Sequence, residues 1–224
     1  MVKKALYDSL PVMAGYLVLG TGFGILMRAA GYGVLWAAAM SIFIYAGSMQ
    51  YVGVGLLTGG ASVITAALTT FMVNARHIFY SISMIDRYRS AGIYRPYLIF
   101  ALTDETYSIV SSDGLAPGKD TDRYRFFLSL FNHSYWILGT LIGSVIGPAL
   151  PFSTMGIEFS MTALFVASFT EQWIVNSDHL PAAAGIVSTF VCLILFGRDY
   201  FLIPSMLLIT FILSLVRWRG GEKI

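Results

Sequence analysis

Length, composition and charge exclude a soluble protein. The chain has 224 residues, of which 57% are apolar and only 12% are charged, and its mean hydropathy is +0.73. Soluble domains carry about 25% charged residues, so 14 Lys and Arg with 12 Asp and Glu cannot cover a surface of this size. Composition therefore excludes a soluble enzyme, a nucleic-acid-binding protein and a secreted disulfide-rich domain. It predicts a multi-pass protein of the cell membrane.

Charge-free stretches divide the chain into segments long enough to cross a bilayer, which takes about 20 helical residues. Residues 29–75, for example, carry no charge and suffice for two crossings. The apolar runs lack the alternation of barrel strands, so we predict an all-α polytopic membrane protein, with seven to eight transmembrane helices in a single membrane domain, residues 1–224. The predicted spans are 10–27, 34–57, 62–84, 97–112, 126–147, 157–174, 182–196 and 200–216.

The distribution of Lys and Arg bears on orientation, because these residues collect in cytoplasmic loops. Eight crossings place both termini on one side, which then holds eight Lys and Arg against five on the other side. This count favours cytoplasmic termini. The cluster of Arg87, Arg89 and Arg95 falls on the opposite side and argues against it. One re-entrant or half-length segment removes the conflict, so seven crossings are the alternative.

The chain also resembles itself at an offset of about 120 residues. Repeat one covers about 10–112 and repeat two about 126–216; the Tyr-Leu-Val-Leu-Gly-Thr of 16–21, for example, recurs as Tyr-Trp-Ile-Leu-Gly-Thr at 135–140. Duplicated halves are typical of transporters, whose substrate site lies where the repeats meet near the membrane midplane. Eight crossings make the two halves parallel, and seven invert them.

Two series of glycines recur within these repeats. Gly20 and Gly24 are spaced four residues apart, as are Gly139, Gly143 and Gly147. Glycines at this spacing share one face of a helix and let another backbone approach closely. They predict close helix packing rather than a binding site.

Several polar residues lie inside predicted spans, where an ionisable side chain costs ~2.5–3.5 kcal/mol at mid-helix. The arginine at 76 can hold a carboxylate through two hydrogen bonds, and helix breaks near Gly47 or at 53–55 would add backbone N–H groups to the same anion. Carboxylates can accept an ammonium group. This chemistry suits a zwitterion. The candidate substrate-binding residues are Ser48, Gln50, Asn74, Arg76, His77, Asp104 and Glu171.

Energy coupling has a second set of candidates. The chain lacks a Gly-x4-Gly-Lys-Ser/Thr phosphate loop, so we expect the proton gradient rather than ATP to drive transport. A proton carrier must be a buried ionisable group, and the candidates are Asp104, Glu105 and Glu171. Asp104 is preferred because Thr103 and Thr106 flank it. No cofactor and no metal site are predicted.

Structural roles for the same residues stay open. Arg76 and His77 can mark the end of the third span and extend to the interface. An Arg76–Asp104 ion pair can serve packing alone. Glu158 stands at the start of a predicted span, where an acidic residue commonly stabilises a helix N-terminus.

These blocks resemble the AzlC family, the large subunit of two-component branched-chain amino-acid exporters. The similarity runs from about residue 10 to past residue 196, and its most specific parts are Asn-Ala-Arg-His at 74–77 and Thr-Asp-Glu-Thr at 103–106. The resemblance implies export of branched-chain or similar apolar amino acids. It also implies a small hydrophobic AzlD-like partner subunit. Composition and spacing alone indicate only a transporter with an internal repeat and a buried Arg, Asp and Glu.

Other functions fit the sequence less well. An intramembrane protease would need a nucleophile motif, but Ser48 follows Ala46-Gly47 and no Gly-x-Gly-Asp motif is present. A membrane channel would need rings of like charge or a carbonyl filter, and neither is evident in this sequence. A non-transporting membrane scaffold is the remaining alternative.

Overall fold

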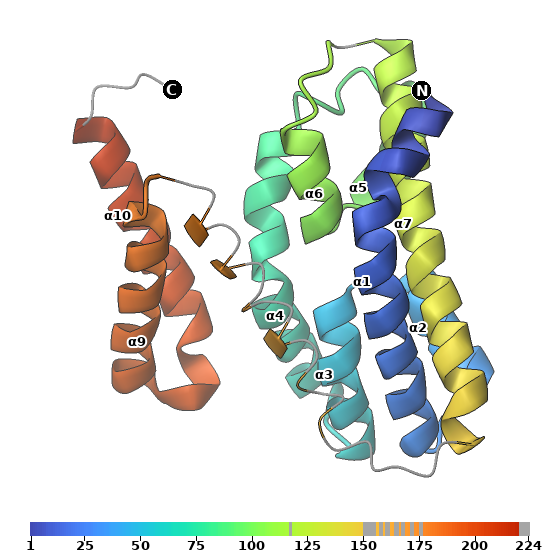
Figure 1. Ribbon diagram of the computed structural model, residues 1–224. Helices are drawn as coiled ribbons and strands as arrows, with labels where there is room; N and C mark the ends of the chain where they lie inside the picture. Colours follow the sequence, from blue (N-terminus) through green and yellow to red (C-terminus); the bar gives the residue numbers. More distant parts are fainter. Residues whose placement is uncertain are drawn as a thin grey trace. The chain divides into compact units, whose positions relative to one another are not determined.

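The computed structural model describes residues 1–116, 118–149 and 177–219, with 156, 159, 162–163, 166, 169–170 and 173–174 between them. Within these residues the fold is helical and has no strand. The chain divides into unit 1, Met1–Met161, and unit 2, Thr162–Ile224 (Figure 1). The helices are α1 (Val2–Ala29), α2 (Val34–Phe43), α3 (Gly47–Thr58), α4 (Val63–Met84), η1 (Gly92–Tyr94), α5 (Arg95–Phe100), α6 (Asp104–Ser111), α7 (Lys119–Ile146), η2 (Gly147–Ala149), α9 (Leu180–Tyr200) and α10 (Leu202–Arg219).

Helices α1 and α7 run parallel and in close contact at the centre of unit 1 (Figure 1). A Cβ at Gly20 would lie 2.8 Å from the Trp136 carbonyl oxygen, and a Cβ at Gly139 would lie 2.8 Å from the Leu17 carbonyl oxygen. Only glycine permits this approach of two backbones. The close helix packing predicted from the glycine series is therefore confirmed.

Substitution at this contact should separate the two helices. A Cβ at Gly143 would overlap the Thr21 carbonyl oxygen, whereas a Cβ at Gly15 on α1 meets no atom within 4 Å. We expect Gly143→Val to destabilise the protein by about 1–3 kcal/mol through overpacking. The matched variant Gly15→Val should have a much smaller effect. Thermal unfolding of the detergent-solubilised variants measures this difference, and equal melting temperatures would contradict the contact.

The predicted span 34–57 is two helices instead of one. α2 ends at Phe43, and Tyr45 has a φ of 45°, a left-handed conformation that an α-helix cannot contain. α3 begins at Gly47, where a Cβ would come within 3.0 Å of the Trp136 ring. The predicted break near Gly47 is present, while 53–55 lies within α3.

The chain reverses direction between α2, which packs mainly against α7, and α3, which packs against α1 and α4; we call this re-entrant pair the α2–α3 hairpin. Gln50 Nε2 of α3 donates a hydrogen bond of 3.1 Å to Ser41 Oγ of α2, across the break. α3 then follows α1 in the same direction, because the Tyr45 ring contacts Tyr16 and the Tyr51 hydroxyl donates to the Leu19 carbonyl oxygen. Since Tyr16 is near the middle of α1, the α2–α3 hairpin reaches from the C-terminal end of α1 to mid-height (Figure 1).

The predicted span 97–112 is also a hairpin, and it enters from the other end of unit 1. At the start of α5 the Tyr97 ring contacts Phe126 of α7, and at its end the Phe100 ring contacts His133 of α7. Because His133 is in the middle of α7, α5 runs from the start of α7 to its middle. The chain turns at 101–103, and α6 returns toward the start of α7 (Figure 1). A hydropathy pattern does not distinguish such a hairpin from one continuous span, because both bury a similar number of apolar residues.

Helix α4 is continuous and runs antiparallel to α1, so it passes the tips of both hairpins (Figure 1). Its N-cap is Ser62, whose hydroxyl accepts a hydrogen bond from the Thr65 N–H. By length and apolar composition, two helices of the described residues meet the requirements of a membrane span, Val2–Ala29 and Leu180–Arg198. α7 carries more polar residues, of which Asn132, His133 and Thr140 are buried.

In unit 2, α9 and α10 pack against each other as an antiparallel pair (Figure 1). Gly197 has a φ of 73° and kinks the chain near the end of α9. Arg198 directly follows this kink. The one cysteine of the chain, Cys192, is buried in α9 and is not in a disulfide.

Candidate functional site

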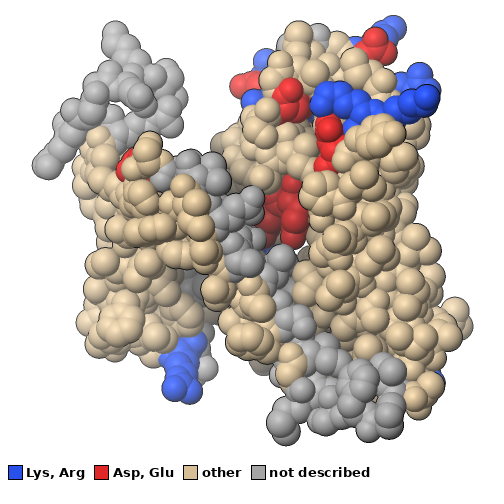
Figure 2. Space-filling view, viewed as in Figure 1, with Lys and Arg blue, Asp and Glu red and all other residues tan. Residues whose placement is uncertain are grey.

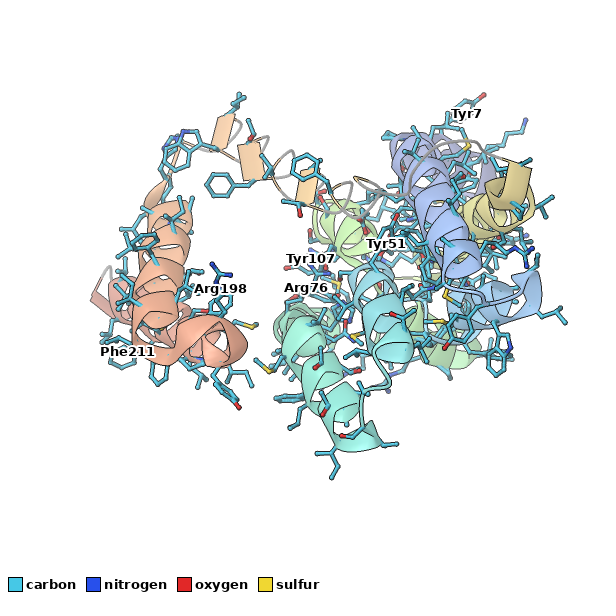
Figure 3. All side chains as sticks on the ribbon, turned by 90° about the horizontal axis from the view of Figure 1, so that it is seen from below. Tyr7, Tyr51, Arg76, Tyr107, Arg198 and Phe211 are labelled. Carbon is cyan, nitrogen blue, oxygen red and sulfur yellow. The ribbon has the colours of Figure 1, made fainter. Side chains whose placement is uncertain are left out.

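Arg76 lies in the middle of α4 and connects the tips of the two hairpins. Its Nη1 lies 2.8 Å from Asp104 Oδ2, and its Nη2 donates a hydrogen bond of 2.6 Å to Ser48 Oγ. Ser48 is the second residue of α3 and Asp104 is the first residue of α6. Figure 3, which looks along the helices, shows Arg76 on α4 near Tyr107 of α6. Arg76 therefore contacts both an acidic residue and the start of a helix that follows a break, although it is partly exposed and not buried as the sequence predicts.

The ion pair is partly open. The side chains of Arg76 and Asp104 are 32% and 37% exposed within the described part of the chain. A fully buried structural pair would be inaccessible to a ligand, whereas this one can be reached. Its two partners also belong to different helices, so a ligand that separates them would act on two elements at once.

The start of α6 is fixed by a chain of hydroxyl groups. Thr103 is the N-cap, and its Oγ1 accepts a hydrogen bond from the Thr106 N–H at 3.3 Å. Thr106 in turn accepts a hydrogen bond of 3.0 Å from Asn132 Nδ2 of α7. N-cap hydroxyls stabilise a helix start by about 1 kcal/mol. These contacts explain why the chain turns at 101–103 and presents the next two residues, both acidic, at mid-height.

Asp104 and Glu105 face different helices. Asp104 contacts Arg76 of α4, whereas Glu105 Oε2 accepts a hydrogen bond of 2.6 Å from the Tyr16 hydroxyl of α1. Consecutive helical residues are rotated by about 100°, so the two carboxylates cannot share a partner. Arg76 thus neutralises Asp104, while a neutral hydroxyl group binds Glu105.

Gln50 lies in a separate network. It is fully buried and, besides its bond to Ser41, accepts a hydrogen bond of 2.9 Å from Trp136 Nε1. Ser41 Oγ lies 2.8 Å from Thr140 Oγ1 of α7. Gln50 is therefore not among the contacts of Arg76 and holds the α2–α3 hairpin against α7.

The other predicted site residues differ in their surroundings. Asn74 and His77 lie on α4 within one turn of Arg76. The Asn74 Oδ1 atom is buried and makes no hydrogen bond with the described residues, and the His77 ring contacts the Tyr80 ring at 5.0 Å. Glu171 and Glu158 lie outside the described residues.

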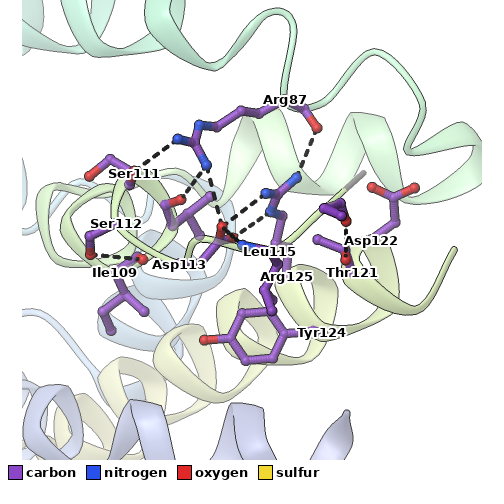
Figure 4. A network of polar contacts seen from close by, with 12 residues as sticks. Arg87, Ile109, Ser111, Ser112, Asp113, Leu115, Thr121, Asp122, Tyr124 and Arg125 are labelled. Atoms are coloured by element: carbon purple, nitrogen blue, oxygen red, sulfur yellow. Dashed lines mark hydrogen bonds and ion pairs between the residues drawn. The ribbon is translucent and has the colours of Figure 1, made fainter. Parts of the chain in front are cut away.

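A second charged cluster lies where α1 and α7 begin (Figure 4). The Asp113 carboxylate, 0% exposed, lies 2.9 Å from Arg125 Nε and 3.3 Å from Arg87 Nη1. Arg125 is 3% exposed and also donates to the Arg87 carbonyl oxygen. Arg87 donates to the carbonyl oxygens at the end of α6. This polar cap, Arg87 with Asp113 and Arg125, joins the ends of α4 and α6 to the start of α7.

Sequence reasoning did not identify Tyr16 as part of the site. Tyrosines in predicted spans are usually interface anchors or packing residues, and the sequence signal at Tyr16 was its place in the repeated block. Its hydroxyl lies 2.8 Å from Thr103 Oγ1 as well as near Glu105. The Tyr16 hydroxyl belongs to α1, whereas its partners lie at the start of α6. Residue spacing within one helix does not reveal a contact between two helices.

Comparison with known proteins agrees with these observations. The AzlC family model, described as AzlC protein, matches residues 11–150. The chain is 41% identical to the branched-chain amino acid transport protein AzlC of Bacillus subtilis over 215 residues, which cover 96% of this chain and 85% of the relative. It is 42% identical to a membrane protein of Haemophilus influenzae over 92% of this chain and 85% of that relative.

A more distant relative is the inner membrane protein YgaZ of Escherichia coli, 28% identical over 85% of this chain and 80% of the relative. No solved structure matches the chain. The match of the family model over more than half of the residues, with 41% identity to a relative over nearly the whole length, shows that this membrane protein belongs to the AzlC family.

Proposed function

We propose that this protein is a secondary transporter that exports branched-chain or similar apolar amino acids across the cell membrane. The observation that carries the proposal is the Arg76–Asp104 ion pair, partly exposed and placed where two helix breaks meet. Broken helices at mid-membrane are typical of transporter substrate sites. The named activity of the Bacillus subtilis relative, branched-chain amino acid transport, supports the same substrate class.

A zwitterionic amino acid matches both members of the ion pair. Its carboxylate can replace Asp104 at the Arg76 guanidinium, and its ammonium group can then bind the released Asp104 carboxylate. Ser48 and the N-terminal N–H groups of α3 and α6 add donors for the carboxylate. Binding of the substrate replaces the Arg76–Asp104 ion pair by two ion pairs, one at each end of the substrate. The additional ion pair offsets the free energy lost when the charged substrate leaves water.

The same exchange provides a route to proton coupling. A proton on Asp104 removes the charge that holds the substrate ammonium, so proton and substrate exclude each other from this carboxylate. Mutually exclusive binding is the requirement for antiport, and an inward proton gradient then drives export. Glu105 and Glu171 are the alternative proton carriers.

Two further parts of the proposal concern assembly. A small hydrophobic AzlD-like subunit is inferred from the family resemblance, and membrane lipid surrounds the remaining apolar surface. The two repeats, about 10–112 and 126–216, are proposed to be parallel. The parallel course of α1 and α7 supports this arrangement, as do their reciprocal glycine contacts at equivalent repeat positions, Gly20 and Gly139.

Counterflow in proteoliposomes tests the function. Vesicles loaded with unlabelled leucine should accumulate labelled leucine or valine transiently, and the rate should saturate with substrate concentration. A channel would equilibrate the label without counterflow, and a scaffold or protease would do neither. Counterflow by the chain alone would also show that the partner subunit is not essential.

Replacement of Asp104 by Asn tests the coupling. The amide oxygen still accepts a hydrogen bond from an ammonium group but cannot bind a proton near neutral pH, so exchange should persist at raised substrate concentration. Accumulation driven by a pH gradient should be lost. Both activities are measured in the same vesicles, with the exposed Asp86→Asn as the control. Uphill export by Asp104→Asn at the rate of the unmodified protein would show that another group carries the proton.

A further inference from the structure

The two hairpins enter unit 1 from opposite ends. The α2–α3 hairpin starts and finishes at the end where α1 finishes, whereas the α5–α6 hairpin starts and finishes at the end where α1 begins (Figure 1). Their tips, 44–46 and 101–103, meet at mid-height, since Tyr45 and Phe100 rings lie 6.4 Å apart. α3 therefore lies beside α4 on one side of Arg76, and α6 lies beside it on the other side, where Tyr107 contacts Tyr80.

The basic residues of unit 1 assign these ends to the two sides of a membrane. Hydrogen bonds and ion pairs join the start of α1, the segment after α4, the end of α6 and the start of α7 at one end, through Tyr124 to Asp8 and through the polar cap. Figure 2 shows charged side chains gathered at this end and few elsewhere on the visible face of unit 1. The basic residues of these segments are Lys3, Lys4, Arg87, Arg89, Arg95, Lys119, Arg123 and Arg125.

At the opposite end, Arg28 is the one Lys or Arg among the described residues of unit 1. This asymmetry is much stronger than the one obtained with continuous spans, because α4 now brings the Arg87, Arg89 and Arg95 cluster to the same side as Lys3 and Lys4. Lys and Arg collect on the cytoplasmic side of membrane proteins. The start of α1 is therefore cytoplasmic, and the α2–α3 hairpin enters from the outer side.

Arg76 binds one residue from each hairpin. Ser48 Oγ, on the outer hairpin, and Asp104 Oδ2, on the cytoplasmic hairpin, contact different nitrogens of its guanidinium. Either contact can break while the other persists. The outer hairpin also makes a neutral network through Gln50 with α7, and the cytoplasmic hairpin is held through Thr106 and Asn132.

We infer that the α2–α3 and α5–α6 hairpins are the outer and cytoplasmic gates of one transport site, and that Arg76 is the shared latch between them. Ser48 and Asp104 are positioning residues for the two gates. This inference rests on the proposed transport function. Substrate bound at Arg76 replaces the latch contact of one hairpin, which frees that hairpin to move while the other stays closed.

Cysteine labelling tests the hairpin topology without measuring transport. In a Cys192→Ser background the chain has no cysteine, so single cysteines at Tyr32 and Thr58 report on the two ends of the α2–α3 hairpin, and cysteines at Ser90 and Ala116 report on those of the α5–α6 hairpin. An impermeant maleimide added to intact cells should label positions 32 and 58. Positions 90 and 116 should be labelled only after permeabilisation.

The alternative outcomes are distinct. Continuous spans would place 32 and 58 on opposite sides, and likewise 90 and 116, so a split within either pair overturns the inference. Labelling of both pairs from the reversed sides would overturn the assignment of gates to faces. If the pairs are split but leucine counterflow remains, the gates are wrong and the proposed function survives. If the pairs label as expected but counterflow is absent even with the AzlD-like subunit present, the proposed function is wrong.

A second measurement tests the latch. Ala75, 7% exposed and adjacent to Arg76, is replaced by cysteine as a reporter in the same background. Ser48→Ala should make this cysteine react several-fold faster with a small impermeant thiosulfonate added from outside, and Asp104→Asn should do so from the cytoplasmic side. The control is Ser134→Ala, because among the described residues this hydroxyl bonds only to the Leu130 carbonyl oxygen of its own helix. Acceleration from the same side in both variants, or in neither, overturns the shared latch.

Discussion

Replacement of Arg76 by lysine should reduce leucine counterflow by about 10- to 100-fold while the protein still folds. Lysine keeps the charge but has a single ammonium group, which cannot reach Ser48 and Asp104 together or hold a carboxylate through two hydrogen bonds. Loss of a charge-assisted hydrogen bond costs about 1.5–3 kcal/mol, which corresponds to this range of rates. Initial rates of counterflow in proteoliposomes measure the effect.

The control for this variant is Arg89→Lys, because Arg89 is exposed and pairs loosely with Asp86 at 3.7 Å. Exposed pairs of this kind contribute little. We expect its counterflow to equal that of the unmodified protein. Undiminished counterflow by Arg76→Lys, with a normal elution profile in detergent, would show that the guanidinium geometry is not used for substrate.

Replacement of Asp113 by alanine should produce the largest loss of stability. It leaves the buried Arg125 guanidinium, 3% exposed, without its carboxylate, and an unpaired buried charge costs about 3–5 kcal/mol. It also removes the acceptor for the Leu115 N–H. The polar cap joins three elements, so its loss should loosen the end of unit 1 as a whole.

Thermal unfolding in detergent measures this effect, with Asp86→Ala as the matched control. Asp86 is acidic and lies one residue before Arg87, but it is exposed and outside the polar cap. Asp113→Asn should be intermediate, because the amide oxygen still accepts a hydrogen bond although it carries no charge. Melting temperatures of Asp113→Ala and Asp86→Ala that agree would contradict the role of the cap.

Much of the helical content could be predicted from hydropathy, and one contact of the site could be predicted from polar residues in apolar runs. The first predicted span lies within α1, and the third nearly coincides with α4. Arg76 and Asp104 stood out because a charge inside a span needs a partner. Their contact follows from opposite charge, without knowledge of the fold.

The hairpins could not be predicted in the same way. An apolar run of span length has the same hydropathy whether it continues or turns back, and the turn depends on one left-handed residue, Tyr45, and on an N-cap at Thr103. The sequence suggested a break at Gly47 and a re-entrant segment as the answer to the charge conflict. Which segments turn back depends on the long-range partners Trp136 and Asn132, which spacing along the chain does not identify.

The hairpins also constrain the order in which the protein assembles during synthesis. Gln50 has its partner Trp136 86 residues later in the chain, and Ser41 has its partner Thr140 99 residues later. Until α7 has emerged from the ribosome, Gln50 and Ser41 can bond to each other, but the Gln50 side-chain oxygen lacks its Trp136 donor, and an unsatisfied polar group in lipid costs several kcal/mol. We therefore expect the segment 34–58 to reach its final packing only after α7 has been inserted and supplies Trp136 and Thr140.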